Sequence, residues 1–132
     1  MTDQLVHIHQ GRSMNTPRVT VLMPVFNGEH FLPPAIESIL NQTFSDFEFL
    51  VIDDGSTDAS RKIAESYNDP RIRIEANEKN LGLIATLNRG LKLARGEYIA
   101  RMDADDLSFP DRLRNKFSSW THILKLAYLE VI

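Results

Sequence analysis

Short apolar runs that alternate with segments of helical spacing are the feature that most constrains how this chain can fold. Val19–Val25 is almost continuously apolar, which is typical of a strand covered on both faces. Further strands are predicted at 47–52, 71–76 and 97–102. Residues 71–76 alternate between polar and apolar, so we expect this strand to be half exposed near an edge of the sheet.

The segments between and after these strands have apolar residues at the spacing of helices. Helices are therefore predicted over 29–42, 56–67, 83–94 and from Pro110 into the C-terminal residues. Pro33 and Pro34 suit the opening turn of the first helix. Ser56, Thr57 and Asp58 are N-cap candidates for the second. Strands joined by helices of this length form right-handed crossovers, which predicts an α/β fold with a mostly parallel sheet.

The composition excludes several classes of protein. The 132 residues suit one domain, and a hydrophobic fraction of 42% is enough for a core. A formal charge of -3 argues against a sequence-independent nucleic-acid binder, which carries a basic surplus. The lack of cysteine excludes a disulfide scaffold and a thiolate metal site. No apolar run approaches the roughly 18 residues of a membrane span, and no signal peptide is recognisable, so a cytoplasmic domain is expected.

Polar residues follow each predicted strand, and two of these strand exits carry pairs of carboxylates. Asp53-Asp54 follows the second strand, and Asp103-Ala104-Asp105-Asp106 follows the fourth. The carboxyl ends of parallel strands open onto one edge of a sheet, and ligands bind there. We therefore expect both acidic segments to lie at one site.

Asp103 and Asp105 are candidates for a metal site. Carboxylates one residue apart can share a hard divalent cation that also holds a diphosphate, and oxygen-only ligands favour Mg²⁺ or Mn²⁺. If the chain stays extended, the two side chains point in opposite directions, so one would bind the metal and the other a water or a ribose hydroxyl. The alternative is that they cap the following helix or form a surface turn.

Asp53 and Asp54 suggest a pocket for a base. A turn and a helix start account for Gly55 to Asp58, but not for two carboxylates at the end of a buried strand, where desolvation is costly. A carboxylate there can accept a hydrogen bond from the imide N–H of uracil. Pro24 releases the first strand from sheet pairing, and Phe26 either lines such a pocket or belongs to the core.

Four motifs, in this order, resemble those of a family 2 glycosyltransferase of the GT-A fold. They are residues 21–28, 51–58, 80–82 and 96–106, within a match from about Arg18 to Lys116. The resemblance implies a Rossmann-like sheet and the inverting transfer of a sugar from a nucleotide-diphosphate sugar, commonly a UDP-sugar, to an acceptor hydroxyl. It also implies glycan synthesis with a glycan or lipid-linked acceptor, which would bring the domain to the inner face of the membrane.

The resemblance assigns roles to individual residues. The substrate-binding positions correspond to Pro24, Phe26, Asn27, Asp53, Asp54 and Asp103, with Asp54 on the base. Asp105, together with Asp103, corresponds to the metal-binding Asp-x-Asp motif, and Asp105 is the better candidate for direct ligation. The metal would stabilise the departing diphosphate as the sugar bond breaks.

The chain departs from the family pattern in two places. Thr86-Leu87-Asn88 stands where many members have Ala-Arg-Asn, so a basic contact to the donor phosphate is missing there. Arg89 could neutralise phosphate or lie solvated on its helix. The sequence also ends where family members usually continue into a half that binds the acceptor and supplies the general base, so no catalytic residue is assigned. We expect a truncated chain with a flexible arm at 1–17, a nucleotide-sugar-binding half-domain at 18–117 and a helical tail at 118–132.

Two other functions fit the same sequence. A fragment that binds a nucleotide-sugar or a partner without catalysis would keep the fold and lack turnover. A nucleotidyltransferase shares the βα layout and the need for a metal, but it normally has a glycine- and lysine-rich loop after the first strand. Asn27-Gly28-Glu29 is not such a loop.

Overall fold

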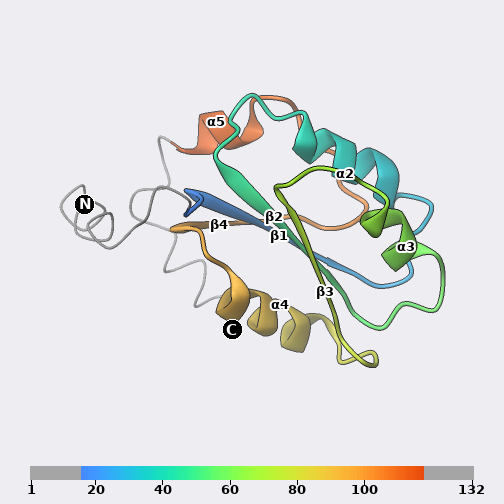
Figure 1. Ribbon diagram of the computed structural model, residues 1–132. Coiled ribbons are helices and arrows are strands. Elements are labelled where there is room, and N and C mark those ends of the chain that lie inside the picture. Colours follow the sequence, from blue (N-terminus) through green and yellow to red (C-terminus); the bar gives the residue numbers. More distant parts are fainter. Residues whose placement is uncertain (1–15, 118–132) are drawn as a thin grey trace.

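The strand exits converge because the chain forms one sheet of parallel strands. The computed structural model describes residues 16–117. Its strands are β1 (Val19–Val25), β2 (Phe47–Asp53), β3 (Ile72–Ala76) and β4 (Tyr98–Arg101). They are hydrogen-bonded in the order β3-β2-β1-β4, and every pair is parallel (Figure 1). The predicted α/β fold with a parallel sheet is confirmed.

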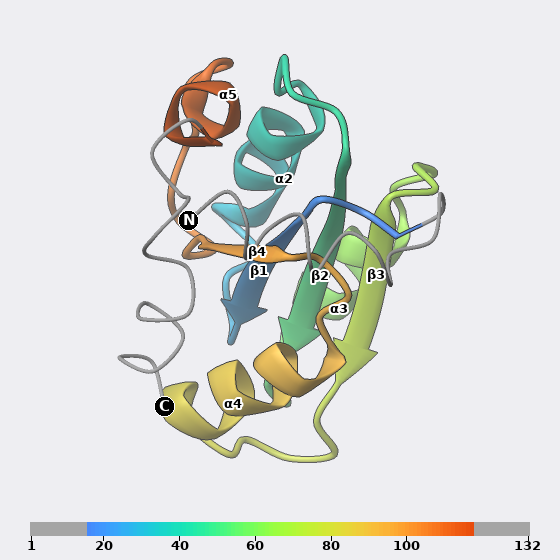
Figure 2. The same ribbon diagram turned by 90° about the vertical axis from the view of Figure 1, so that its left-hand side faces the viewer.

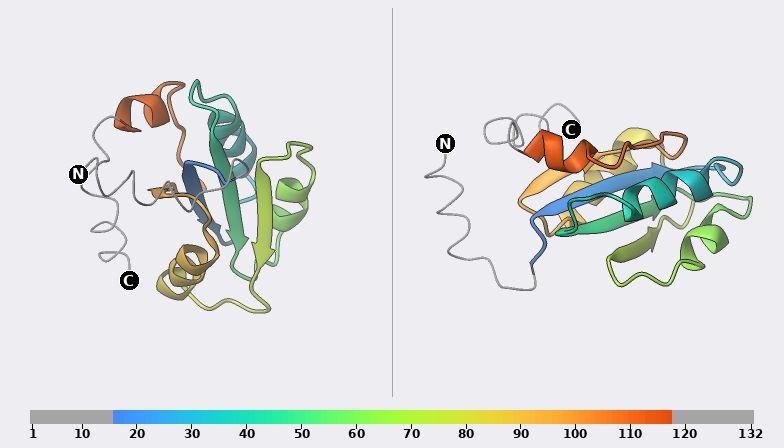
Figure 3. Two further views of the ribbon diagram at one scale, coloured as in Figure 1. Left: turned by 60° about the vertical axis from the view of Figure 1, so that its left-hand side comes forward. Right: turned by 90° about the horizontal axis from the view of Figure 1, so that it is seen from above.

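Helices cover both faces of this sheet. They are α2 (Leu32–Leu40), α3 (Ser60–Glu65), α4 (Leu83–Leu93) and α5 (Arg112–Phe117). α2, α3 and α5 lie on one face, and α4 covers the other (Figure 2). Figure 3 shows the same layers from two further sides. Within residues 16–117, none of the helices has the length and apolar character that a membrane crossing requires.

Each face of the sheet has its own apolar core, because successive strand residues point to opposite faces. Phe49 of β2 packs in one core with Ile36 of α2. Leu22 of β1 packs in the other core with Leu87 of α4. β1 and β2 are buried along their whole length, whereas β3 is half-buried at the edge of the sheet, as predicted.

Pro24 lies where β1 has lost one of its two neighbours. β4 pairs with β1 only from Val19 to Leu22, and Met102 N donates the last main-chain bond on this side to Leu22 O at 2.9 Å. Pro24 is two residues beyond Leu22, so its missing N–H belongs to the side that β4 no longer covers. The predicted release from pairing is therefore confirmed for one side of the strand, while β1 stays paired with β2 up to Val25.

The predicted bounds of two helices are wrong. α2 is shorter than the predicted 29–42, with proline in its first turn as expected. α3 begins only at Ser60, because the predicted N-cap residues 56–58 bond to the exit of β1, although Asp58 Oδ1 also accepts a hydrogen bond from Ser60 N at 2.9 Å. The predicted tail at 118–132 and most of the predicted arm at 1–17 lie outside the described residues.

Gly96 lies against β1 so closely that no side chain fits. A Cβ at this position would lie 2.4 Å from Thr20 N and 2.6 Å from Val19 C, backbone atoms of a central strand. We expect Gly96→Ala to lower the free energy of unfolding, measured in urea, by about 3 kcal/mol, because overpacking displaces the strand. Ala85→Ser, at an exposed position of α4, is the control and should cost about 0.5 kcal/mol. Equal stability of Gly96→Ala and the wild type would contradict this close approach.

Candidate functional site

Asn27 joins the exits of β1 and β2. Its backbone has a positive φ of 51°, and its N–H donates to Ser56 Oγ at 2.9 Å. Its side-chain oxygen accepts hydrogen bonds from the N–H groups of Thr57 at 2.8 Å and Asp58 at 3.3 Å. Asp58 in turn accepts one from Glu29 N at 3.2 Å. These contacts delay the start of α3, and they commit the amide oxygen of Asn27 to the loop.

The Asp54 carboxylate organises the connection between β3 and α4. The residue is only 4% exposed. Its Oδ1 accepts hydrogen bonds from Asn77 Nδ2 and Leu81 N, both at 2.8 Å. Its Oδ2 accepts from Asn80 Nδ2 and Gly82 N, both at 3.0 Å. The connection is thereby folded around the carboxylate, and it enters α4 through Gly82, whose φ of 97° suits glycine.

These hydrogen bonds keep Asp54 ionised. Burial alone would raise the pKa of this carboxyl group, but the bonds from Leu81 N, Asn77 and Gly82 N favour the charged form and lower the pKa of Asp54 below its usual value. The end of β2 therefore presents a fixed negative charge at neutral pH.

A pocket of about 230 Å³ opens beside Asp54 at the carboxyl edge of the sheet. Its lining residues are Pro24, Val25, Phe26, Asp54, Asn80, Gly82, Leu83 and Thr86. Three of the predicted substrate-binding residues, Pro24, Phe26 and Asp54, therefore share one cavity. Phe26 is half exposed, so it belongs to the pocket wall and not to the core.

The wall contributed by the third strand exit is not identified by sequence reasoning. Asn80 and Gly82 belong to one of the four family motifs, but the motif assigns them no contact with a ligand, and Leu83 and Thr86 resemble ordinary helix residues. They become wall residues because Asp54 holds this turn over the end of β2. No local sequence pattern predicts this long-range contact between Asp54 and the turn before α4.

Asp53 points to the opposite face of the sheet from Asp54, as successive strand residues do. It is 4% exposed, and its Oδ2 accepts a hydrogen bond from Ser56 N at 3.3 Å. Its Oδ1 is buried and has no hydrogen-bond partner within residues 16–117. The structure thus separates the acidic pair, because Asp54 lines the pocket whereas Asp53 holds the turn after β2. Neither Asp53 nor Asn27 lines the pocket.

Asp103, Asp105 and Asp106 gather in a turn after β4. One carboxylate oxygen from each lies within 4.8 Å of the others. The chain does not stay extended here, since Asp106 N donates to Asp103 O at 3.1 Å, so the expected opposite directions of Asp103 and Asp105 do not arise. Arg101 pairs with Asp103 at 3.2 Å and offsets part of the repulsion. Three oxygen ligands open to solvent fit a hard divalent cation.

The C-terminal end of α2 holds the segment that follows this acidic turn. Gln42 Nε2 donates to Phe109 O at 2.7 Å, and Gln42 Oε1 accepts from Leu113 N at 3.0 Å. Ser108 N donates to Ser38 Oγ at 3.0 Å. The acidic turn is therefore fixed by β4 before it and by α2 after it.

Comparison with known families decides the relationship of this chain. Residues 20–121 match the family model described as Glycosyl transferase family 2. The chain belongs to this family. EpsE of Bacillus subtilis is 45% identical over 103 residues, which cover 76% of this chain and 37% of EpsE.

Solved structures of similar proteins confirm the GT-A fold of this family 2 domain. S. aureus TarS 1–349, crystallised in complex with UDP-GlcNAc, has a TM-score of 0.73 and 30% identity, over 76% of this chain and 30% of that one. The mannosyltransferase PcManGT from Pyrobaculum calidifontis, in complex with GDP-Man and Mn²⁺, has a TM-score of 0.71 and 26% identity, over 90% of this chain and 38% of that one. The match thus spans less than two fifths of the length of EpsE, TarS and PcManGT.

Asp54→Asn tests the charge at the centre of the β3–α4 connection. One oxygen becomes an NH₂ group that faces N–H donors, so we expect the free energy of unfolding at pH 7 to fall by about 2–3 kcal/mol. The pKa of Asp54 is lower in the folded chain than its unfolded value of about 3.9. Its stabilisation is therefore present above that value and is lost as the pH falls through the folded pKa. Urea unfolding at pH 7 and pH 3 should show the variant and the wild type converging at low pH.

Glu78→Gln provides the matched control, because Glu78 is exposed in the same connection. It should change the free energy of unfolding by less than about 0.5 kcal/mol at either pH. A gap between the wild type and Asp54→Asn that is equally large at both pH values would contradict the role given to the ionised carboxylate.

Proposed function

We propose that this chain binds the nucleotide part of a UDP-sugar, for inverting transfer of the sugar to an acceptor hydroxyl in glycan synthesis. The observation that carries the proposal is the pocket that joins Phe26 to the buried, ionised Asp54, at the same edge of the sheet as the acidic turn. The UDP-GlcNAc complex of TarS supports a nucleotide-sugar ligand.

Phe26 and Asp54 supply the two contacts that a uracil ring needs. The half-exposed ring of Phe26 offers a stacking surface. Asp54 already accepts four hydrogen bonds, about as many as a carboxylate has lone pairs, so the imide N–H of the base must replace one donor. Asn80 is the donor that can yield, because it is exposed and lines the pocket. Its released amide can then donate to a carbonyl oxygen of the same ring.

The acidic turn forms the diphosphate side of the proposed site. Asp105 and Asp103 would hold Mg²⁺ or Mn²⁺, and Asp106 adds a third carboxylate. When bound, such an ion supplies positive charge against the departing diphosphate. The protein's own contribution is to keep the carboxylates together in a turn that β4 and α2 anchor. The Mn²⁺ complex of PcManGT supports a divalent ion.

The remaining predicted substrate contacts stay part of the proposal. Asp53 Oδ1 is a buried acceptor with no partner within residues 16–117, but Asp53 lies outside the pocket, so its proposed contact with a ligand hydroxyl requires the turn after β2 to move. Asn27 shapes the loop beside it through the bonds to Thr57 and Asp58. The acceptor in this proposal is a glycan or a lipid-linked glycan at the inner face of the membrane.

A second candidate function is nucleotide-sugar binding without turnover. It is favoured by the match to only 37% of the length of EpsE, because residues that bind the acceptor can lie in the rest of such a protein. Transfer of sugar to an acceptor by the 132-residue chain alone would exclude this candidate.

Asp105→Asn should weaken the binding of UDP in the presence of Mn²⁺ by about tenfold or more. Loss of a group that merely orients a metal ligand already costs about 10–100-fold in metal affinity. Calorimetry with and without Mn²⁺ measures the effect, which should vanish when the metal is omitted. Glu65→Gln, an exposed acidic residue on α3, is the control. Binding of UDP that depends on neither Mn²⁺ nor Asp105 would contradict the metal assignment.

Phe26→Ala should weaken UDP binding by about tenfold, because stacking of a base on an aromatic ring contributes about 1–3 kcal/mol. Phe26→Tyr keeps the ring and should bind as the wild type does. Phe109→Ala is the matched control, since Phe109 is 84% exposed and does not line the pocket. Fluorescence or calorimetric titration with UDP separates these cases. Equal losses in Phe26→Ala and Phe109→Ala would argue against a base pocket at Phe26.

A further inference from the structure

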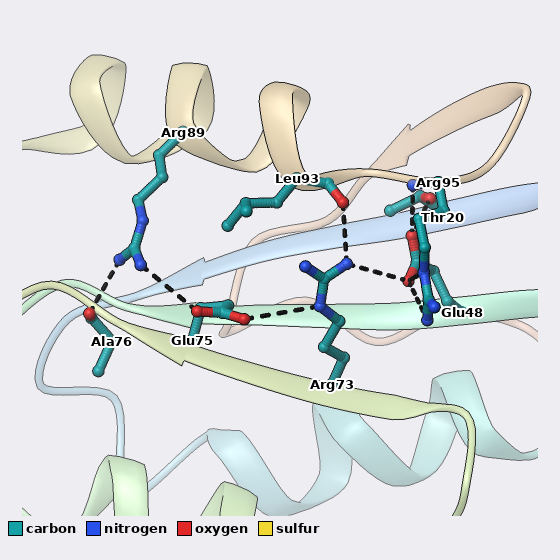
Figure 4. A network of polar contacts seen from close by, with 8 residues as sticks. All are labelled: Thr20, Glu48, Arg73, Glu75, Ala76, Arg89, Leu93 and Arg95. Atoms are coloured by element: carbon teal, nitrogen blue, oxygen red, sulfur yellow. Dashed lines mark hydrogen bonds and ion pairs between the residues drawn. The ribbon is translucent and has the colours of Figure 1, made fainter.

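Arg89 reaches from α4 back to the end of β3 (Figure 4). Its Nη1 donates to Ala76 O at 2.8 Å and to Asn77 Oδ1 at 2.7 Å. Its Nη2 lies 3.4 Å from Glu75 Oε1. The guanidinium is therefore engaged by the end of β3, which is not the arrangement of a solvated arginine on a helix face.

Asn77 connects this guanidinium to the pocket. The residue is 7% exposed, and its Nδ2 donates to Asp54 Oδ1 at 2.8 Å and to Thr86 Oγ1 at 3.0 Å. Asp54 and Thr86 are both pocket wall residues. Asn77 itself does not line the pocket, so it can influence a ligand only through its neighbours.

The Arg89 contact reinforces the orientation of the Asn77 amide that Asp54 also favours. An amide turned by 180° would place its oxygen against the Asp54 carboxylate and its NH₂ group against the Arg89 donor, and both contacts would be repulsive. With Arg89 in place, only one orientation satisfies both neighbours. Without Arg89, the preference would rest on Asp54 and Thr86 alone.

Glu75 is itself held from the far side, which keeps Arg89 in position. Arg73 Nε lies 3.6 Å from Glu75 Oε2, and Arg73 Nη1 donates to Leu93 O at 2.8 Å (Figure 4). Arg73 Nη1 also lies 3.7 Å from the buried Glu48. Arg89 is thus the last member of a row of alternating charges that runs along the sheet toward the pocket.

We propose that Arg89 is a positioning residue for base recognition, acting through Asn77 to hold the Asp54 carboxylate in the pocket wall. The inference rests on the proposed function, because it names the support of the same base pocket. It assigns Arg89 no contact with the phosphates of the donor.

The test compares Arg89→Met, Arg89→Lys and the control Lys92→Met, an exposed cation on the same helix. Each 132-residue chain is titrated with UDP, with UDP methylated at N3 of the uracil, and with inorganic pyrophosphate, all with Mn²⁺. The methylated base cannot donate to Asp54. Pyrophosphate carries no base, so it reports on the metal and phosphate side alone.

We expect Arg89→Met to bind UDP about tenfold more weakly, since a hydrogen bond to a charged group contributes about 1.5–3 kcal/mol and only part of it is lost. Its affinity for pyrophosphate should not change, and its preference for UDP over the methylated analogue should shrink. Arg89→Lys keeps a cation near Asn77 Oδ1 and should restore UDP binding to within about threefold of the wild type. Lys92→Met should match the wild type for all three ligands.

Two results would overturn the positioning role. An equal loss for UDP and pyrophosphate in Arg89→Met would make Arg89 a phosphate ligand. Unchanged affinity for UDP and unchanged preference over the methylated analogue, in a variant whose thermal unfolding shows it folded, would make the contact purely structural.

A ligand-free measurement separates failure of this inference from failure of the proposed function. If the wild type does not bind UDP, or does not distinguish it from the methylated analogue, the base pocket itself is wrong. The side-chain amide signals of Asn77 in NMR spectra still report on Arg89 in that case. These signals should shift, and the amide hydrogens should exchange faster with water, in Arg89→Lys and Arg89→Met but not in Lys92→Met. Unchanged signals would overturn the positioning role of Arg89. If Arg89→Met does not fold, the NMR measurement on Arg89→Lys carries the test.

Discussion

The site depends on a single buried carboxylate. Asp54 lies at the end of a strand with only 4% of its surface exposed, and an ion in such a place is tolerated only when hydrogen bonds replace the lost water. Two main-chain N–H groups and two asparagine amides supply those bonds, and all of them come from the connection between β3 and α4. The requirement to satisfy one charge therefore joins the second strand, the third strand and the helix on the far face.

The rest of the fold places the Asp54 carboxylate at the carboxyl edge of the sheet, where a ligand can reach it. β1 and β2 are mostly apolar on both faces, and their buried polar pair, Thr20 and Glu48, is hydrogen-bonded within the protein. The side chains that can meet a ligand therefore lie at the carboxyl ends of the strands. The shortness of β4 leaves the end of β1 uncovered on one side at Pro24. Phe26 and Asp54 then stand beside an open pocket.

The two halves of the proposed site are supported in different ways. The base side is built around Asp54, and its positions are set by hydrogen bonds that cross from one strand exit to the next. The metal side is a tight turn after β4, and its position is set by Gln42, whose amide holds the backbone at Phe109 and Leu113. Because different contacts hold the two sides, changes at Arg89 are expected to affect binding of the base without affecting binding of the metal.

The sequence by itself determined the elements and the edge on which chemistry occurs. Runs such as Val19–Val25 indicate buried strands directly, because hydrophobic periodicity is a local property, and the family motifs pointed to Pro24, Phe26 and Asp54, which the structure brings into one pocket. Only the tertiary structure decided which neighbours those residues acquire. No local pattern predicts the contact between Asn77 and Arg89, since it joins the end of β3 to α4. Ser56 to Asp58 likewise look like a helix cap until Asn27 binds them. Local patterns specify strands and helices, whereas the partners of a buried charge are specified only when distant segments meet.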